Sequence, residues 1–130
     1  MLVKFAVVAG SASKDLGKRI ARRLKAPYVE AKTRVFPDGE SKITFGRIPK
    51  NSIVLVVQST YPPVDTNLLQ ALSIISQARK ASSKIYAIIA YMDYEKQDRQ
   101  FLSGEIVTMS IVAKMLEVAS AKLVVVVDIH

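Results

Sequence analysis

Cysteine is absent from this chain of 130 residues, and histidine occurs once, at position 130. Without cysteine the chain can form neither a disulfide framework nor a thiolate metal site. Long hydrophobic runs are absent too: the apolar stretches have the length of strands, and none could cross a bilayer (Ile53–Val57, Ile85–Ala90 and Leu123–Val127). We therefore expect a cytoplasmic protein with no membrane partner.

The two common glycine-rich nucleotide loops are also missing. The sequence contains neither the GxxxxGK[ST] pattern nor the GxGxxG pattern. Both patterns bind phosphates through backbone N–H groups at the start of a helix. If this chain binds a nucleotide, it must therefore do so by a different kind of site.

Acidic residues are scarce in the first part of the chain. Residues 1–50 hold 12 Lys and Arg against 4 Asp and Glu, whereas residues 51–130 hold 7 of each kind. A basic face suits nucleic acid, an anionic small molecule or an acidic partner surface. The simpler interpretation is a solvated helix face. No aromatic residues alternate with the cations, so single-strand binding by base stacking has little support.

The remaining composition predicts one packed α/β domain over residues 1–130. Half of the residues are hydrophobic and the mean hydropathy is +0.22. Strand and helix patterns alternate, which is typical of a mostly parallel sheet flanked by helices, and a small β-hairpin is inserted around residues 30–46. The expected strands are Leu2–Val8, Tyr28–Val35, Lys42–Phe45, Ser52–Gln58, Lys84–Ala90 and Leu123–Val127, and the expected helices are Lys14–Lys25, residues 65–80 and about 106–120.

Caps and apolar stripes refine these helices. Ser13 is placed to cap the first helix, and Asp65 or Thr66 to cap the second. Apolar residues that recur at helical spacing predict the face that each helix turns to the core. These residues are Leu16, Ile20 and Leu24 in the first helix, Leu68, Leu72 and Ile75 in the second, and Ile111, Met115 and Val118 in the third.

Three polar constellations fall in loops or at strand ends. The first, Phe36-Pro37-Asp38-Gly39-Glu40, offers a ring for stacking and two carboxylates that can accept hydrogen bonds from an amino group. Its residue types also dominate ordinary hairpin turns, so a purely structural role is the alternative. The second, Tyr94–Gln100, follows an expected core strand, where functional loops of α/β proteins gather. It could equally be an exposed, self-paired charged loop.

The third constellation is the pair Asp128 and His130. Two residues apart on an extended strand, their side chains point the same way, at the carboxyl end where ligands bind to open α/β sheets. They form a candidate Mg²⁺ site, although a partial one, because Mg²⁺ prefers oxygen ligands and keeps water and substrate phosphates in its shell.

In this order and at these intervals, Phe36–Glu40, Tyr94-x-Lys96-Gln97-Asp98-Arg99 and Asp128-Ile129-His130 resemble the N-terminal half of the ribose-phosphate pyrophosphokinases, or phosphoribosyl pyrophosphate synthetases. The similarity is greater to the archaeal branch. It implies a phosphoribosyltransferase type I-like fold and transfer of the diphosphoryl group of Mg-ATP to ribose 5-phosphate. It also implies a homo-oligomer, dimeric or hexameric.

The resemblance implies a role for each motif. Phe36 would stack near the adenine while Asp38, Gly39 and Glu40 form the loop that reads its edge, often across a subunit interface. Lys96 and Gln97 would contact ATP, with Asp98 and Arg99 holding their loop. Asp128 and His130 would lie at the magnesium-bound phosphates.

Two departures qualify the resemblance. Lys96 stands where the family usually has arginine, which keeps the charge but loses the planar fork. The acidic phosphoribosyl-binding loop of the family is absent, so we expect a fragment that is inactive alone. The alternatives are a non-catalytic associated subunit and, with less support, a basic nucleic-acid-binding domain.

Overall fold

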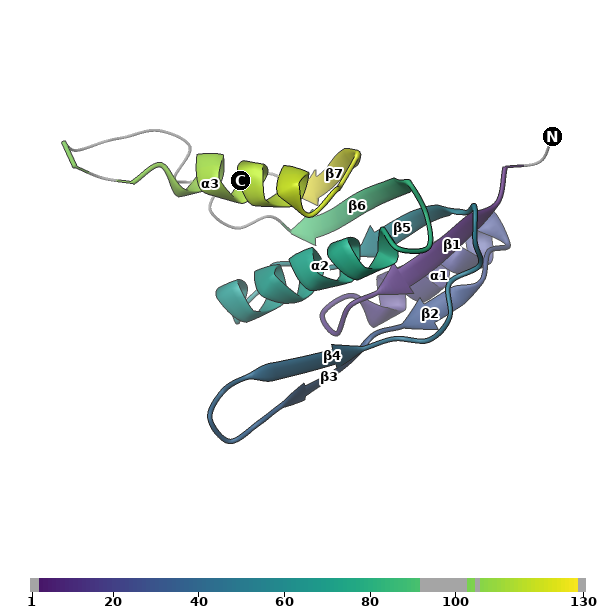
Figure 1. The fold of residues 1–130 in the computed structure, drawn as a ribbon, viewed down its shortest axis with the longest axis horizontal. Coiled ribbons are helices and arrows are strands. Elements are labelled where there is room, and N and C mark those ends of the chain that lie inside the picture. The colour runs from purple at the N-terminus through teal and green to yellow at the C-terminus, as the bar shows by residue number, and fades with distance from the viewer. Residues whose placement is uncertain (1–2, 92–102, 105, 129–130) are drawn as a thin grey trace.

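A computed structural model of the chain describes residues 3–91, 103–104 and 106–128. Five parallel strands form one sheet in the order β2-β1-β5-β6-β7, and an antiparallel hairpin forms a second sheet. This architecture confirms the expected α/β class and the hairpin insertion (Figure 1). The strands are β1 (Phe5–Ala9), β2 (Tyr28–Glu30), β3 (Lys32–Val35), β4 (Ser41–Thr44), β5 (Ile53–Val57), β6 (Lys84–Tyr91) and β7 (Leu123–Asp128), and the helices are α1 (Lys14–Leu24), α2 (Val64–Ala78) and α3 (Thr108–Val118).

The two faces of the parallel sheet have different cover. Strand residues alternate between the faces, so Ala6 and Val8 join the core beneath α2 and α3, whereas Val7 joins the core beneath α1. In Figure 1, α2 lies in front of the strands and the fainter α1 behind them. Burial on both faces explains why β5 is a nearly continuous apolar run without alternation.

The predicted strand over residues 28–35 is in fact two strands. Ala31 is fully buried between them, and its N–H donates to the carbonyl of Ala9 (2.9 Å). The chain leaves the parallel sheet there and continues as the first strand of the hairpin. Local β propensity predicted the extended conformation of both segments. The strand with which each segment pairs is decided by the tertiary structure.

The apolar stripe predicted for α3 is wrong. Val112 and Leu116 are buried, whereas Ile111, Met115 and Val118 are exposed, Val118 by 85%. Apolar residues lie on several sides of this helix, so helical spacing alone allowed more than one stripe. For α1, Gly17 and Ala21 are buried, while Leu24 at the end of the predicted stripe is exposed.

The α2 stripe was predicted correctly at Leu68 and Ile75, which are both buried. The N-terminal cap predicted for this helix is wrong. The helix begins at Val64 with Pro63 at the N-cap position, so Asp65 and Thr66 lie in its first turn and not at the cap. Within the described residues, no helix combines the length and the apolar character that a membrane span requires.

Candidate functional site at the carboxyl edge of the sheet

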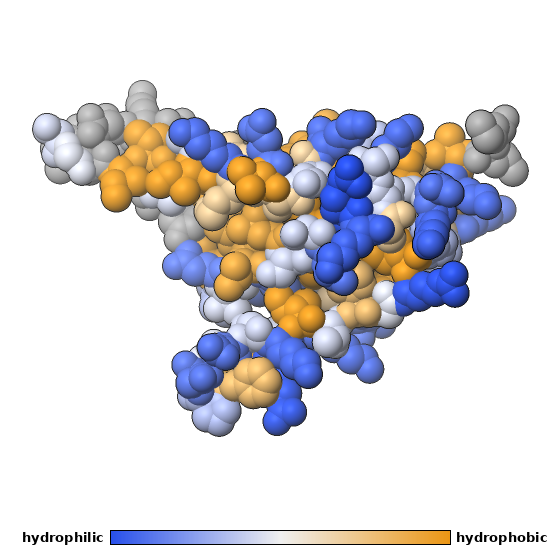
Figure 2. Space-filling model, viewed as in Figure 1, coloured by the Kyte–Doolittle hydropathy of each residue, from blue (hydrophilic) through white to orange (hydrophobic). Residues whose placement is uncertain are grey.

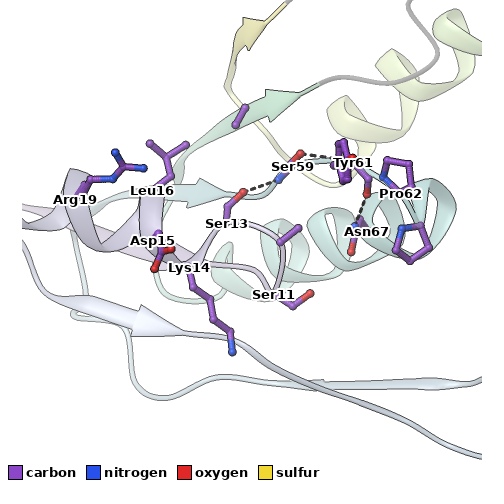
Figure 3. Close-up of a pocket in the computed structure, with 13 residues that line it drawn as sticks. Ser11, Ser13, Lys14, Asp15, Leu16, Arg19, Ser59, Tyr61, Pro62 and Asn67 are labelled. Atoms are coloured by element: carbon purple, nitrogen blue, oxygen red, sulfur yellow. Dashed lines mark hydrogen bonds between the residues drawn. The ribbon is translucent and has the colours of Figure 1, made fainter.

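Two loops meet at the carboxyl edge of the parallel sheet and enclose an open cavity of about 830 Å³. One loop, residues 10–13, follows β1, and the other, residues 58–63, follows β5. Figure 3 shows the side chains that line the cavity, which come from both loops, from the first two turns of α1, from the first turn of α2 and from the end of β6. They include Ser11, Lys14, Arg19, Ser59, Tyr61 and Asn67.

Two buried glutamines connect these loops. Gln70, on α2, accepts a hydrogen bond from the Ser11 N–H (2.6 Å), and its amide donates to Ser11 Oγ (2.9 Å). Gln58, the first residue of the loop after β5, accepts from the Ala12 N–H (3.1 Å). A side chain at Gly10 would collide with both glutamine amides. The backbone of the first loop is therefore held directly by the side chains of the second loop and α2.

Ser13 and Asn67 complete this network. Ser13 occupies the N-cap position of α1, as predicted, but its side chain forms no capping bond, because its Oγ accepts a hydrogen bond from the Ser59 N–H instead (2.9 Å). The Asn67 amide donates to the Tyr61 carbonyl (2.6 Å). The polar groups that face the cavity are thus positioned by hydrogen bonds, which is the kind of preorganisation that binding sites require.

The hairpin tip presents the first predicted constellation. The Gly39 N–H donates to the Phe36 carbonyl (2.9 Å), and the Phe36 N–H to the Glu40 carbonyl (2.8 Å). Gly39 has φ +92°, as a turn that closes a three-residue hairpin loop requires. Asp38 Oδ1 accepts from the Glu40 N–H (3.0 Å), so Asp38 does have the structural role that we considered as the alternative. The ring of Phe36 is partly exposed, and Glu40 is exposed.

The third constellation lies at the far strands of the same edge. Asp128, the last residue of β7, is in register with Tyr91, the last residue of β6. The carbonyl of Tyr91 accepts from both the N–H (2.9 Å) and the hydroxyl (2.8 Å) of Thr60, and its ring lies 5.8 Å from the ring of Tyr61. The end of β7 is therefore joined to the wall of the cavity.

The other predicted site residues lie outside the described residues: Lys96, Gln97, Asp98, Arg99 and His130. Among the residues that the structure does describe, no three acidic or histidine side chains cluster as a metal site would require.

Sequence analysis overlooked Gln58, Asn67 and Gln70. A signal was present, because each polar residue interrupts an apolar pattern: Gln58 follows the run of β5, and Asn67 and Gln70 flank the pair Leu68-Leu69 on α2. All three are buried. A polar side chain at a core position is costly unless it forms hydrogen bonds, so it marks a specific interaction.

Residues 5–120 match the N-terminal domain of ribose phosphate pyrophosphokinase. The chain belongs to this family. Over 125 residues it is 38% identical to the ribose-phosphate pyrophosphokinase of Methanothermobacter thermautotrophicus and 32% identical to that of Sulfurisphaera tokodaii, covering 95% of this chain in each case. It spans 44% and 43% of these relatives, less than half of their length.

Solved structures agree with the assignment of this pyrophosphokinase domain. The phosphoribosylpyrophosphate synthetase of Mycobacterium smegmatis has a TM-score of 0.88 at 27% identity, with 98% of this chain and 43% of that chain covered. The APRTase of Giardia lamblia, solved with 9-deazaadenine, has a TM-score of 0.56 at 13% identity, with 98% and 71% covered. The second likeness concerns the fold alone and supports the phosphoribosyltransferase type I-like architecture.

Proposed function

We propose that this chain is the ATP-binding half of a ribose-phosphate diphosphokinase. One observation carries the proposal: an exposed hairpin tip presents a partly exposed ring beside two carboxylates, on a turn held by three hydrogen bonds. Membership of the pyrophosphokinase family supports it. A flat ring suits the face of a purine, and carboxylate oxygens suit an exocyclic amino group.

Each residue of the tip has a distinct role in this proposal. Phe36 stacks on the adenine. The carboxylate of Glu40 and the second oxygen of Asp38 accept hydrogen bonds from its amino group. Gly39 allows the close turn between them. In an assembled homo-oligomer, dimeric or hexameric, the projecting hairpin would reach into the nucleotide site of a neighbouring copy.

The proposed reaction moves a diphosphoryl group. The C1 hydroxyl oxygen of ribose 5-phosphate bonds to the β-phosphorus, the bond from that phosphorus to the α,β-bridging oxygen breaks, and AMP leaves while the hydroxyl loses its proton. Such a transfer depends on in-line positioning and charge neutralisation. Mg²⁺, held by Asp128 and His130 with the phosphates, would neutralise charge. Lys96 and Gln97 would contact ATP, and Asp98 and Arg99 would hold their loop.

A calorimetric titration of Mg-ATP into the chain tests the base site. Replacing Phe36 by alanine should weaken binding about tenfold or more, because stacking of a base on an aromatic ring contributes roughly 1–3 kcal/mol. The neighbouring Val35→Ala is the matched control, since Val35 is 59% exposed and points to the other face of the strand. Equal affinities for all three proteins would contradict the proposal.

A turnover assay tests whether this half is active without the rest of the length that the relatives have. We expect no AMP from ATP and ribose 5-phosphate with this chain alone, because the ribose 5-phosphate site is proposed to lie in the remaining length that the relatives have. AMP formation by the chain alone would refute this. A non-catalytic associated subunit is the second candidate, favoured by Lys96, and it predicts that Lys96→Arg leaves ATP affinity unchanged.

A further inference from the structure

The outer face of α1 carries charge almost entirely of one sign. The helix packs against the sheet through Gly17 and Ala21, which are buried. Seven residues of α1 and its C-cap are charged and exposed, and Asp15 is the one acid among them. The other six are cations, which we call the basic face of α1: Lys14, Lys18, Arg19, Arg22, Arg23 and Lys25. This short segment therefore holds six of the 12 cations in residues 1–50.

Helix stability does not account for the basic face of α1. The cations of the last turn, Arg22 and Arg23, interact favourably with the negative end of the helix dipole. Lys14, however, is the first residue of the helix, where the dipole disfavours a positive charge. Lys18 lies one turn from both Lys14 and Arg22, and like charges four residues apart destabilise a helix. A face that needs only to be soluble can mix both signs, so this excess of one sign indicates a partner.

Few groups of the protein itself neutralise these cations. Lys14 Nζ lies 3.8 Å from Glu30 Oε2, and Lys18 Nζ lies over the ring of Tyr28, 5.9 Å from its centroid. Lys18 nevertheless remains exposed. Among the described residues, no ion pair forms with the four other cations, Arg19, Arg22, Arg23 and Lys25. Five cations, all except Lys14, are therefore available to an external anion.

The residue types of α1 argue against three kinds of partner. A helix that binds a membrane inserts its apolar face, but Leu16 and Ile20 pack against the core of the sheet. Single-stranded nucleic acid is bound by aromatic rings on which its bases stack, and no residue of α1 is aromatic. Protein interfaces are enriched in aromatic residues and Met and depleted of Lys, which the basic face of α1 does not match.

A nucleic-acid duplex does match it. Lys and Arg contact the phosphates of a duplex, and such contacts need neither apolar nor aromatic groups. From Lys14 to Lys25 the helix rises about 16 Å, and a duplex presents about nine phosphate charges over that length. Recognition of RNA relies on contacts to its 2′-hydroxyl groups, but no residue of α1 has a hydroxyl or amide side chain. The basic face of α1 therefore fits the backbone of DNA.

We propose that the basic face of α1 binds the phosphate backbone of duplex DNA without regard to base sequence. This goes beyond the proposed function and does not depend on it, because it uses neither the hairpin tip nor Asp128. The five available cations allow five phosphate contacts. Each contact steepens the fall of log affinity with log salt concentration by about 0.9. Raising the salt from about 50 mM to about 200 mM should therefore weaken binding about 500-fold.

The test measures how binding of the whole chain to a labelled DNA duplex depends on salt, by fluorescence anisotropy. A duplex of about 20 base pairs is longer than the face. The triple variant Lys18→Gln, Arg22→Gln, Arg23→Gln keeps two of the available cations, so the same rise in salt should weaken its binding only about tenfold. The control makes the same charge change at exposed positions outside α1 and should keep the wild-type dependence: Lys80→Gln, Lys114→Gln, Lys122→Gln.

Stability measurements distinguish lost contacts from lost structure. The α1 variant removes neighbouring like charges, so its melting temperature should equal or exceed that of the wild type. A wild-type chain that does not bind the duplex at about 50 mM salt overturns the inference. It is also overturned if the control variant loses as much of the salt dependence as the α1 variant, because total charge alone would then explain the attraction.

Other polyanions test the assignment to duplex DNA. The comparison ligands are single-stranded DNA, duplex RNA of the same sequence and phosphatidylserine vesicles. Duplex DNA should bind more tightly than the single strand, whose lower charge density releases fewer counterions, and at least as tightly as duplex RNA. Vesicles should bind more weakly than the duplex, because α1 has no free apolar face to insert. Tighter binding to any of the three overturns the assignment.

Discussion

Gln70 and Ser11 exchange two hydrogen bonds although they lie 59 positions apart in the sequence. The glutamine accepts from the backbone N–H of Ser11 and donates to its hydroxyl, so one buried side chain satisfies two groups of the β1–α1 loop. Gln58 accepts one further hydrogen bond, from the backbone N–H of the next residue, Ala12. The cavity at the carboxyl edge of the sheet therefore has a wall that is determined by α2 and β5.

Replacing Gln70 by methionine should lower the free energy of unfolding by about 1–3 kcal/mol, because the volume is kept while a buried N–H loses its partner. Urea unfolding measures the change. Gln77→Met, at an exposed position of the same helix, is the control and should have little effect. Equal losses of unfolding free energy in the two variants would show that the hydrogen bonds between Gln70 and Ser11 do not contribute to stability.

Gly17→Ala should destabilise the protein, although alanine favours a helix interior by about 1 kcal/mol over glycine. The added Cβ would come within 2.5 Å of the Cβ of Ala9, so α1 would have to move away from β1. Chemical unfolding of the variant tests this. The double variant Ala9→Gly with Gly17→Ala should lose less unfolding free energy than the sum of the losses in the two single variants. Strict additivity of the two losses would argue against the contact.

Gly39→Ala should disturb the hairpin tip. Gly39 has φ +92°, where a Cβ costs about 1 kcal/mol or more, although there is open space around it. We expect a lower melting temperature and, under the proposed function, weaker binding of Mg-ATP. Gly46→Ala is the matched control, because Gly46 also faces open space but has no positive φ. If the two variants behave alike, the turn does not depend on glycine.

Tyr28 should ionise late. Burial, together with its hydrogen bond to Glu30 and the charge of that carboxylate, raises the pKa of Tyr28 to about 12 from its ordinary value of 10.0. The neutral phenol is therefore favoured by the fold, and the stability that it contributes is complete below pH 10 and is lost as the pH rises towards 12. Absorbance of tyrosinate during an alkaline titration measures this.

Two variants identify the group whose ionisation is observed near pH 12. Tyr28→Phe should remove the absorbance change near pH 12. Glu30→Gln should lower the pKa of Tyr28 only in part, because burial is the larger cause and remains. An unchanged titration in Tyr28→Phe would show that another group ionises there.

Much of this architecture could be predicted from the sequence, because the patterns that indicate it lie in neighbouring residues. Apolar runs predicted the cores of β1, β5, β6 and β7, and the residues Pro37, Asp38 and Gly39 predicted the turn between β3 and β4. The stripe of α3 could not be read in this way. Several apolar faces of that helix compete, and only contact with the sheet selected Val112 and Leu116.

The sequence by itself therefore determined the order and type of the elements, the hairpin turn and the family, since each depends on neighbouring residues or on motifs in order. Only the tertiary structure decided that the hydroxyl of Ser13 accepts from the Ser59 N–H rather than from the first turn of α1, and that Gln58 and Gln70 hold the loop after β1. Parallel strands require crossover connections, so these partners are separated by 46 to 59 positions. Their pairing depends on packing in space, which no local pattern encodes.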